Sequence, residues 1–192
     1  MNIPNSERLT FRLMDENDAE LLWQLDQNPE VMRHITHGKI SSMDNILSHF
    51  IPRLNSYHNA DKGWGLWQVS TLALQDEPQE FLGWILIRPM NFFSDSPELN
   101  NLEIGWRFFQ HTWGKGYATE AAKAIIQALT QVFSQKGNIQ KGNIDFFSAT
   151  AFANNHASIS IMKKLGMDLR KEYNHQDSFG THPSVYYQMQ VK

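Results

Sequence analysis

Between residues 118 and 133, apolar side chains recur with the 3.6-residue period of an α-helix that buries one face. They occupy positions 118, 121, 122, 125, 126, 129, 132 and 133. A helix with such a stripe is stabilised mainly by packing its apolar face against other elements. The rest of the chain must therefore provide an apolar surface for this long helix.

Four strands are predicted before this helix, in segments where apolar, β-branched and aromatic residues gather between turn signals. They span residues 9–14, 63–71, 81–87 and 102–109. Residues 19–27 have the pattern of a short amphipathic helix, residues 30–59 show mixed helical patterning, and residues 91–101 read as a polar loop.

After the long helix we expect one more helix and three strands. The helix spans residues 155–165 and is closed by Gly166. The strands span residues 145–152, 167–173 and 184–191, and residues 176–183 read as a loop. No shift in composition marks a linker, so this order of elements predicts one mixed α/β domain.

A tandem repeat follows the long helix. Residues 135–139 and 140–144 have the same sequence, Gln-Lys-Gly-Asn-Ile. Five residues are too few to form a stacking unit of a repeat protein, so we interpret the duplication as a loop expansion.

Composition excludes several classes of protein. The 192 residues include 17 Lys and Arg against 20 Asp and Glu, and no basic run stands out. This argues against partners such as nucleic acid or an anionic membrane. The chain has no cysteine, which excludes disulfides and a cysteine nucleophile. No apolar signal region or membrane-spanning stretch is found, which predicts a soluble cytoplasmic protein.

The histidines show no grouping typical of metal ligands. His34-x-x-His37 lacks a supporting acid or a third ligand. We therefore expect no metal.

A glycine-rich segment, Trp113-Gly114-Lys115-Gly116-Tyr117, separates the strand at 102–109 from the long helix. Two glycines allow a tight backbone turn, and the first N–H groups of a helix lack partners within it. Together they predict a binding site for an anion. The segment lacks the spacing of a P-loop and the third glycine of a Rossmann fingerprint.

Three ordered motifs resemble the GNAT superfamily of acetyl-CoA-dependent N-acetyltransferases, with a likeness that spans residues 8 to 190. The motifs are Glu103-Ile104-Gly105-Trp106, the stretch from Trp113 to Ala121, and Asn155-x-x-Ser158 running to Lys164-Leu165-Gly166-Met167. Residues 9–13 and 28–32 resemble the opening of the branch that contains the RimJ and RimL ribosomal-protein N-terminal acetyltransferases. The resemblance implies a single domain over residues 8–192. Its fold would be α/β (α+β), a mixed, mostly antiparallel sheet of about seven strands that is splayed between strands 4 and 5 and flanked by helices.

The resemblance also implies acetyl-CoA as co-substrate and a set of binding residues. Its pyrophosphate would lie on the loop, and its pantetheine arm would pair with the backbone near Phe108, where an amide polarises the thioester carbonyl. Asn155 and Ser158 would contribute further contacts. The loop residues implied are Trp113, Gly114, Lys115, Gly116, Tyr117, Ala118 and Thr119. Trp113 replaces the usual Arg or Gln, so one charged contact to the phosphates is not expected.

Two candidate catalytic residues follow from the resemblance. Glu103 occupies a position where relatives often place a carboxylate that takes the proton of the amine through water. The tyrosine that protonates the leaving thiolate in many members would fall at Met162, and Ser158, one helical turn earlier, is a substitute donor. The alternatives are an exposed strand residue for Glu103 and a plain cofactor contact for Ser158.

Three further residues near the loop have competing interpretations. His111 is either a base that titrates near neutral pH or a surface residue. Glu120 is either a base or a first-turn carboxylate that the helix dipole favours. Lys115 either neutralises phosphate charge or faces solvent.

The sequence thus predicts an N-acetyltransferase that moves acetyl directly to a primary amine in a ternary complex. The acceptor is either a protein N-terminal amine or a small molecule such as a polyamine or an antibiotic. A non-catalytic sensor that binds acyl-CoA is the alternative of another class. A homodimer is expected by family likeness.

Overall fold

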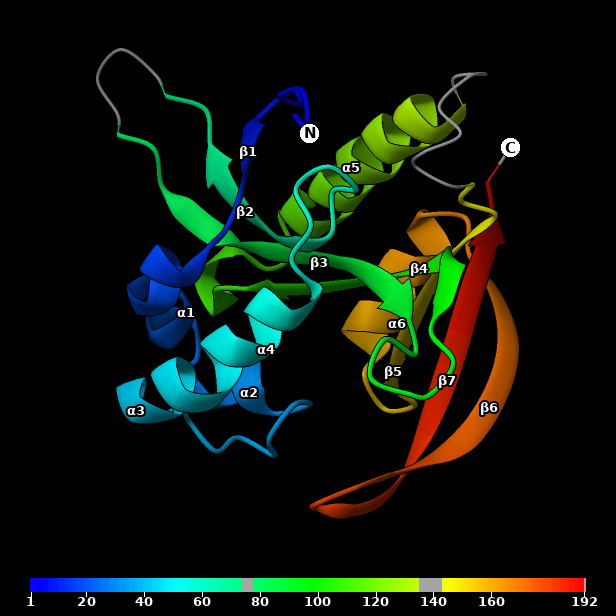
Figure 1. Cartoon of the computed structure of the whole chain (residues 1–192). Helices are drawn as coiled ribbons and strands as arrows, with labels where there is room; N and C mark the ends of the chain where they lie inside the picture. The colour runs from blue at the N-terminus through cyan, green and yellow to red at the C-terminus, as the bar shows by residue number, and fades with distance from the viewer. Residues whose placement is uncertain (74–77, 135–142, 192) are drawn as a thin grey trace.

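A computed structural model describes residues 1–73, 78–134 and 143–191, and it contains one seven-stranded sheet (Figure 1). The strand order is β1-β2-β3-β4-β5-β7-β6. All neighbouring strands are antiparallel except β4 and β5, which are parallel. The predicted mixed sheet of about seven strands is confirmed. The strands are β1 (Leu9–Leu13), β2 (Gly65–Thr71), β3 (Phe81–Met90), β4 (Glu98–Phe108), β5 (Phe146–Phe152), β6 (Asp168–Asp177) and β7 (Gly180–Gln190).

Helices cover both faces of this sheet (Figure 1). One face packs against α5 (Tyr117–Ser134) and α6 (His156–Lys164), and the other packs against a group of shorter helices. Neighbouring residues of β2 point to opposite faces of the sheet. Trp67 belongs to the core under α5, whereas Leu66 belongs to the core under the shorter helices. The shorter helices are α1 (Ala19–Leu25), α2 (Pro29–Met32), α3 (Met43–Asn45) and α4 (Ile51–Tyr57), together with the 3-10 helix η1 (Glu16–Asp18) and the π-helix η2 (Ile46–Phe50). A further 3-10 helix, η3 (Gln110–Thr112), precedes α5.

The two long helices follow their predicted patterns. The stripe of α5 is buried from Ala121 to Leu129 against the sheet. The side chain of Asn155 caps α6, because its Oδ1 accepts a hydrogen bond of 3.1 Å from the N–H of Ser158. Gly166 ends α6 with φ +83°, a conformation that glycine adopts without the steric cost of a Cβ. Among the described residues, no helix is long and apolar enough to cross a membrane.

Two predicted loops contain strand instead. β4 begins at Glu98, inside the segment predicted as a loop at 91–101. β6 and β7 extend through the segment predicted as a loop at 176–183, so only two residues separate them. β6 lies at the edge of the sheet and is almost entirely exposed, so it needs no alternation of apolar residues. The repeat falls mostly on residues 135–142, which lie outside the described residues.

Strands β4 and β5 part soon after they meet. They pair only from Asn101 to Glu103 on β4, opposite residues 146–148 on β5. Beyond this point β4 stays paired with β3, and β5 stays paired with β7. A buried polar cluster holds the closed end, where the hydroxyl of Ser148 donates to Asn101 Oδ1 at 2.6 Å and lies 2.7 Å from Tyr186 Oη. The predicted splay is present. Glu103 is the last residue of β4 to pair with β5, and this point is the vertex of the splayed strands.

Candidate active site

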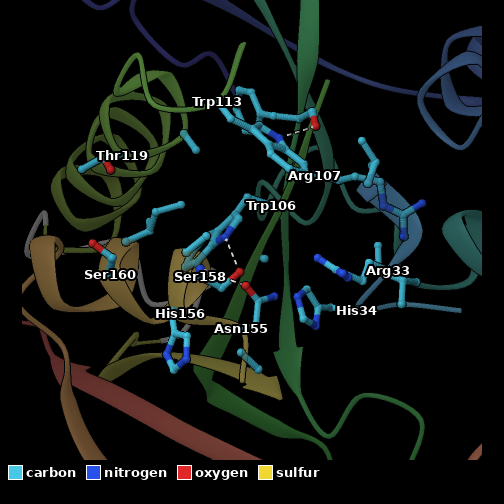
Figure 2. A pocket seen from close by; sticks show the side chains of 18 of the residues that line it. Arg33, His34, Trp106, Arg107, Trp113, Thr119, Asn155, His156, Ser158 and Ser160 are labelled. Atoms are coloured by element: carbon cyan, nitrogen blue, oxygen red, sulfur yellow. Dashed lines mark hydrogen bonds between the residues drawn. The ribbon is translucent and has the colours of Figure 1, made fainter. Parts of the chain in front are cut away.

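The gap between the splayed strands opens into a cleft of about 750 Å³ (Figure 2). Its walls come from β3, β4, β5, the loop before α5, the first turn of α5 and one side of α6. Residues in and just after α2 also border it: Glu30, Val31, Arg33, His34 and Ile35. The predicted site residues that line it are Phe108, Trp113, Gly114, Gly116, Tyr117, Ala118, Thr119, Asn155 and Ser158. Glu103 and Lys115 are outside the lining.

The backbone of the glycine loop presents donors to this cleft. Gly114 and Gly116 have φ of +74° and +82°, a region in which a side chain would be strained. In the described part of the chain, the N–H groups of residues 114–119 donate to no protein acceptor, and the first bond of the helix runs from Glu120 N to Gly116 O. These donors and the N-terminal end of the 18-residue helix α5 make a concave site of positive potential.

Trp113 fixes the loop to the end of β4. Its indole Nε1–H donates a hydrogen bond of 2.9 Å to the carbonyl oxygen of Phe108. The N–H of Phe109 donates to Leu82 on the β3 side, so the N–H and C=O of Phe108 point to the opposite edge, toward the gap. The indole takes one acceptor position of this carbonyl, and the N–H of Phe108 faces the gap.

The loop is also tied to the N-terminal segment. Arg8 Nη1 donates to the carbonyl of Lys115 at 3.1 Å, and Arg8 Nη2 lies 2.6 Å from Glu120 Oε2. The carboxylate of Glu120 also accepts from the hydroxyl of Ser6 and from the backbone N–H of Arg8. Glu120 thus acts as a structural anchor at the first turn of α5. His111 lies on the surface, 2.7 Å from Glu80 Oε1, and does not line the cleft.

Ser158 faces the cleft with its hydroxyl proton available. Trp106 Nε1 lies 3.2 Å from Ser158 Oγ, and the dashed line in Figure 2 marks this bond. An indole N–H can only donate, so Ser158 accepts and its own O–H is left to donate elsewhere. Met162 is buried in the core under α6 and offers no donor.

Glu103 is held by Arg88 at the vertex. Arg88 Nε donates to Glu103 Oε2 at 2.7 Å, and both side chains are 17% exposed. Within the described residues, no hydrogen bond engages Oε1 of Glu103. The carboxylate has one oxygen fixed and one free, and Glu103 precedes the cleft residues Ile104 and Gly105 on β4.

A model of the acetyltransferase (GNAT) domain matches residues 8–168 of this sequence. The chain belongs to the GNAT acetyltransferase family. It is accordingly an acetyl-CoA-dependent N-acetyltransferase. Two proteins of Bacillus subtilis are similar to it in sequence: the uncharacterized protein YkkB is 30% identical over 86% of this chain and 85% of its own length. The uncharacterized N-acetyltransferase YnaD is 28% identical over 84% of this chain and 80% of its own length.

Solved structures share the fold of this GNAT domain. An acetyltransferase of the GNAT family from Bacillus anthracis has a TM-score of 0.74 and 21% identity, over 100% of this chain and 99% of that chain. RimL, the ribosomal L7/L12 alpha-N-protein acetyltransferase in complex with coenzyme A, has a TM-score of 0.71 and 17% identity, over 100% of this chain and 98% of that chain. Spermidine N-acetyltransferase from Vibrio cholerae, in complex with CoA and spermine, has a TM-score of 0.69 and 12% identity, over 97% of each chain.

Several cleft residues of the GNAT domain were not predicted from the sequence. Arg33 and His34 follow α2 and border the cleft, and burial lowers the pKa of His34, with the charge of Arg33 adding to this effect. Arg107 also lines the cleft and forms a buried ion pair with Asp26 at the end of α1. The resemblance of residues 28–32 to a family motif was the one signal in the sequence that pointed to the region of Arg33 and His34. No local sequence pattern points to Arg107.

Glu120→Gln is expected to destabilise the GNAT domain by about 1 kcal/mol at neutral pH, a value reduced because Arg8 is 42% exposed. Burial raises the pKa of Glu120, but the hydrogen bonds from Ser6 and Arg8 outweigh it and leave the pKa below its ordinary value of 4.5. A lowered pKa stabilises the fold above pH 4.5, and this contribution disappears as the pH falls through the folded-state pKa. Urea unfolding of the unsubstituted protein and of Glu120→Gln, at pH 7 and in acid, measures this contribution to stability. An equal difference at both pH values would contradict the assignment.

Proposed function

We propose that this GNAT acetyltransferase moves acetyl from acetyl-CoA directly to a primary amine in a ternary complex, with a protein N-terminal amine as acceptor, as in the RimJ and RimL branch. One observation supports the proposal: the free amides of residues 114–119 and the open edge of β4 line one cleft, and Glu103 is the last residue of β4 to pair with β5 before this cleft opens. A phosphate group, a thioester and an amine are each matched by one of these three features.

The proposed binding residues for acetyl-CoA lie along the gap between β4 and β5, and each part of the cofactor is assigned to one set of them. The pyrophosphate is assigned to the backbone of Gly114, Lys115 and Gly116 and to the first turn of α5, Tyr117, Ala118 and Thr119. The N–H of Phe108 pairs with the pantetheine arm, while Trp113 keeps the loop in place. Asn155 supports the cofactor side indirectly, because it fixes the first turn of α6 and with it Ser158.

The proposed chemistry uses Glu103 and Ser158. An ammonium ion must lose a proton before it can attack a thioester, and the free Oε1 of Glu103 takes that proton through a water molecule. The nitrogen attacks the thioester carbon and the carbon–sulfur bond breaks. The proton that the nitrogen loses as the amide forms reaches the thiolate through water, so CoA leaves as the thiol. Ser158 donates a hydrogen bond to the thiolate with the proton that the contact to Trp106 leaves free.

The charge of the cleft bears on the acceptor. In its described lining the one carboxylate, Glu30, lies 3.2 Å from Arg33, and Arg107 is paired with Asp26. The lining therefore offers no unpaired carboxylate to the additional ammonium groups of a polyamine. A protein N-terminus brings one charge, at the amine that must be deprotonated.

An acceptor screen tests the proposed function. Release of free CoA from acetyl-CoA is followed with peptides that carry a free N-terminus, with the same peptides blocked at that amine, with polyamines and with aminoglycosides. We expect release with free peptides and none with blocked ones. Binding of acetyl-CoA without release by any amine would support a sensor instead, and preference for polyamines would overturn the proposed acceptor.

A further inference from the structure

Two histidines and an aspartate from distant parts of the chain converge beside the cleft. His37 lies in the segment after α2, Asp177 ends β6, and His182 lies on β7. One ligand atom of each side chain lies within 4.8 Å of the others. In the sequence, His34 is the one histidine close to His37; the β6–β7 hairpin supplies an acid and a second imidazole from about 140 positions later.

The distance between His182 and Asp177 fits two metal ligands better than a hydrogen bond. His182 Nε2 lies 3.4 Å from Asp177 Oδ1, which is long for a hydrogen bond. Two ligand atoms that bind one metal ion tetrahedrally, each about 2.0 Å from the ion, lie roughly 3.3 Å from each other. His182 Nε2 is also shielded from solvent and has no hydrogen-bond partner among the described residues. A buried ring nitrogen without a partner is costly, and a metal ion would satisfy it.

The surroundings hold the three ligands in place. The backbone N–H of Phe179 donates to Asp177 Oδ1 at 2.7 Å and orients the carboxylate, as outer partners of metal ligands do. The ring of His37 lies 4.7 Å from that of His182, and both rings pack on Phe152 at 6.0 and 5.0 Å. His37 adopts φ +55°, which is uncommon outside glycine, and its ring lies 4.9 Å from that of Phe179 between β6 and β7.

We propose that His37, Asp177 and His182 form a site for a divalent transition metal ion of the zinc type. Two imidazoles and one carboxylate are a ligand set that zinc prefers, with water in the fourth position. The ion links the segment after α2 to the β6–β7 hairpin. Phe152 lines the cleft and packs on both histidines, so the ion fixes one wall of the cleft entrance. The proposal does not depend on the acceptor or on turnover.

Calorimetric titration of the metal-free protein with ZnCl2 tests the site, and Co²⁺ serves as a second probe through its visible absorption in tetrahedral coordination. We expect one ion per chain, at least 100-fold weaker binding in His182→Ala and in Asp177→Asn, and unchanged binding in His49→Ala, which removes an exposed histidine outside the cluster.

Thermal unfolding separates a lost site from a lost fold. Zn²⁺ should raise the unfolding midpoint of the unsubstituted protein and of His49→Ala, and it should leave the midpoint of His182→Ala unchanged while far-UV circular dichroism shows that the variant is folded. Absence of stoichiometric binding to the unsubstituted protein, or equal affinity in folded His182→Ala, would overturn the proposal.

Discussion

Replacement of Arg107 by leucine is expected to lower the free energy of unfolding by about 3–5 kcal/mol. Arg107 on β4 pairs with Asp26 at the end of α1, and the two side chains are only 9% and 3% exposed. Asp26 also accepts a hydrogen bond of 2.8 Å from the hydroxyl of Ser41, and the guanidinium lies 5.0 Å from the ring of Trp84. Removal of the cation leaves a buried carboxylate without its charge partner, and an uncompensated buried charge strongly destabilises the folded state.

The exposed pair of Arg170 and Asp168 provides a matched control for this prediction. Its atoms are 3.7 Å apart and its side chains are 49% and 75% exposed, so Arg170→Leu should change stability by less than about 0.5 kcal/mol. Urea unfolding of both variants measures the difference. The double variant Asp26→Leu with Arg107→Leu should be more stable than the sum of the single losses predicts, because neither charge is then left alone. Arg107→Leu within 1 kcal/mol of the unsubstituted protein would contradict the account.

Glu103→Gln is expected to lower amine-dependent turnover by about 10²- to 10⁴-fold. Glutamine has the shape of glutamate and keeps an oxygen that accepts from Arg88, so the vertex of the splayed strands is retained. It cannot take a proton from the acceptor. The affinity for acetyl-CoA, measured by calorimetry, should stay within about twofold, because the amides of residues 114–119 are untouched.

A control separates this effect from a general loss of stability. Glu172 is exposed on β6, and Glu172→Gln should leave both turnover and unfolding unchanged. Turnover is measured with the best acceptor of the screen, at saturating amine. If Glu103→Gln retains full turnover, the carboxylate serves only as the ion-pair partner of Arg88.

Local patterns predicted the features of this fold that depend on neighbouring residues. The stripe of α5 follows from its period, and the donors of residues 114–119 follow from two glycines ahead of a helix. The role of Trp113 was not visible, because its partner, the carbonyl of Phe108, carries no mark in the sequence. Residues 176–183 were predicted as a loop instead of the tip of the β6–β7 hairpin, because β6 is a polar, exposed edge strand and because Pro183 on β7 is typical of a turn.

Features that depend on distant residues were out of reach. Arg107 and Asp26 are 81 positions apart, and neither stands in a motif that points to the other. Arg88 meets Glu103 only because β3 and β4 pair in one register, so the sequence suggested the carboxylate without its partner. The cluster of His37, Asp177 and His182 joins elements from opposite halves of the chain, and for that reason the sequence predicted no metal.

A crystal structure of the protein with acetyl-CoA would show whether the backbone of the glycine loop holds the cofactor. We expect diphosphate oxygens within hydrogen-bonding distance of the main-chain N–H groups of residues 114–119, and the thioester in the gap between β4 and β5. A diphosphate held by side chains elsewhere on the surface, or a gap that stays closed to the thioester, would contradict it.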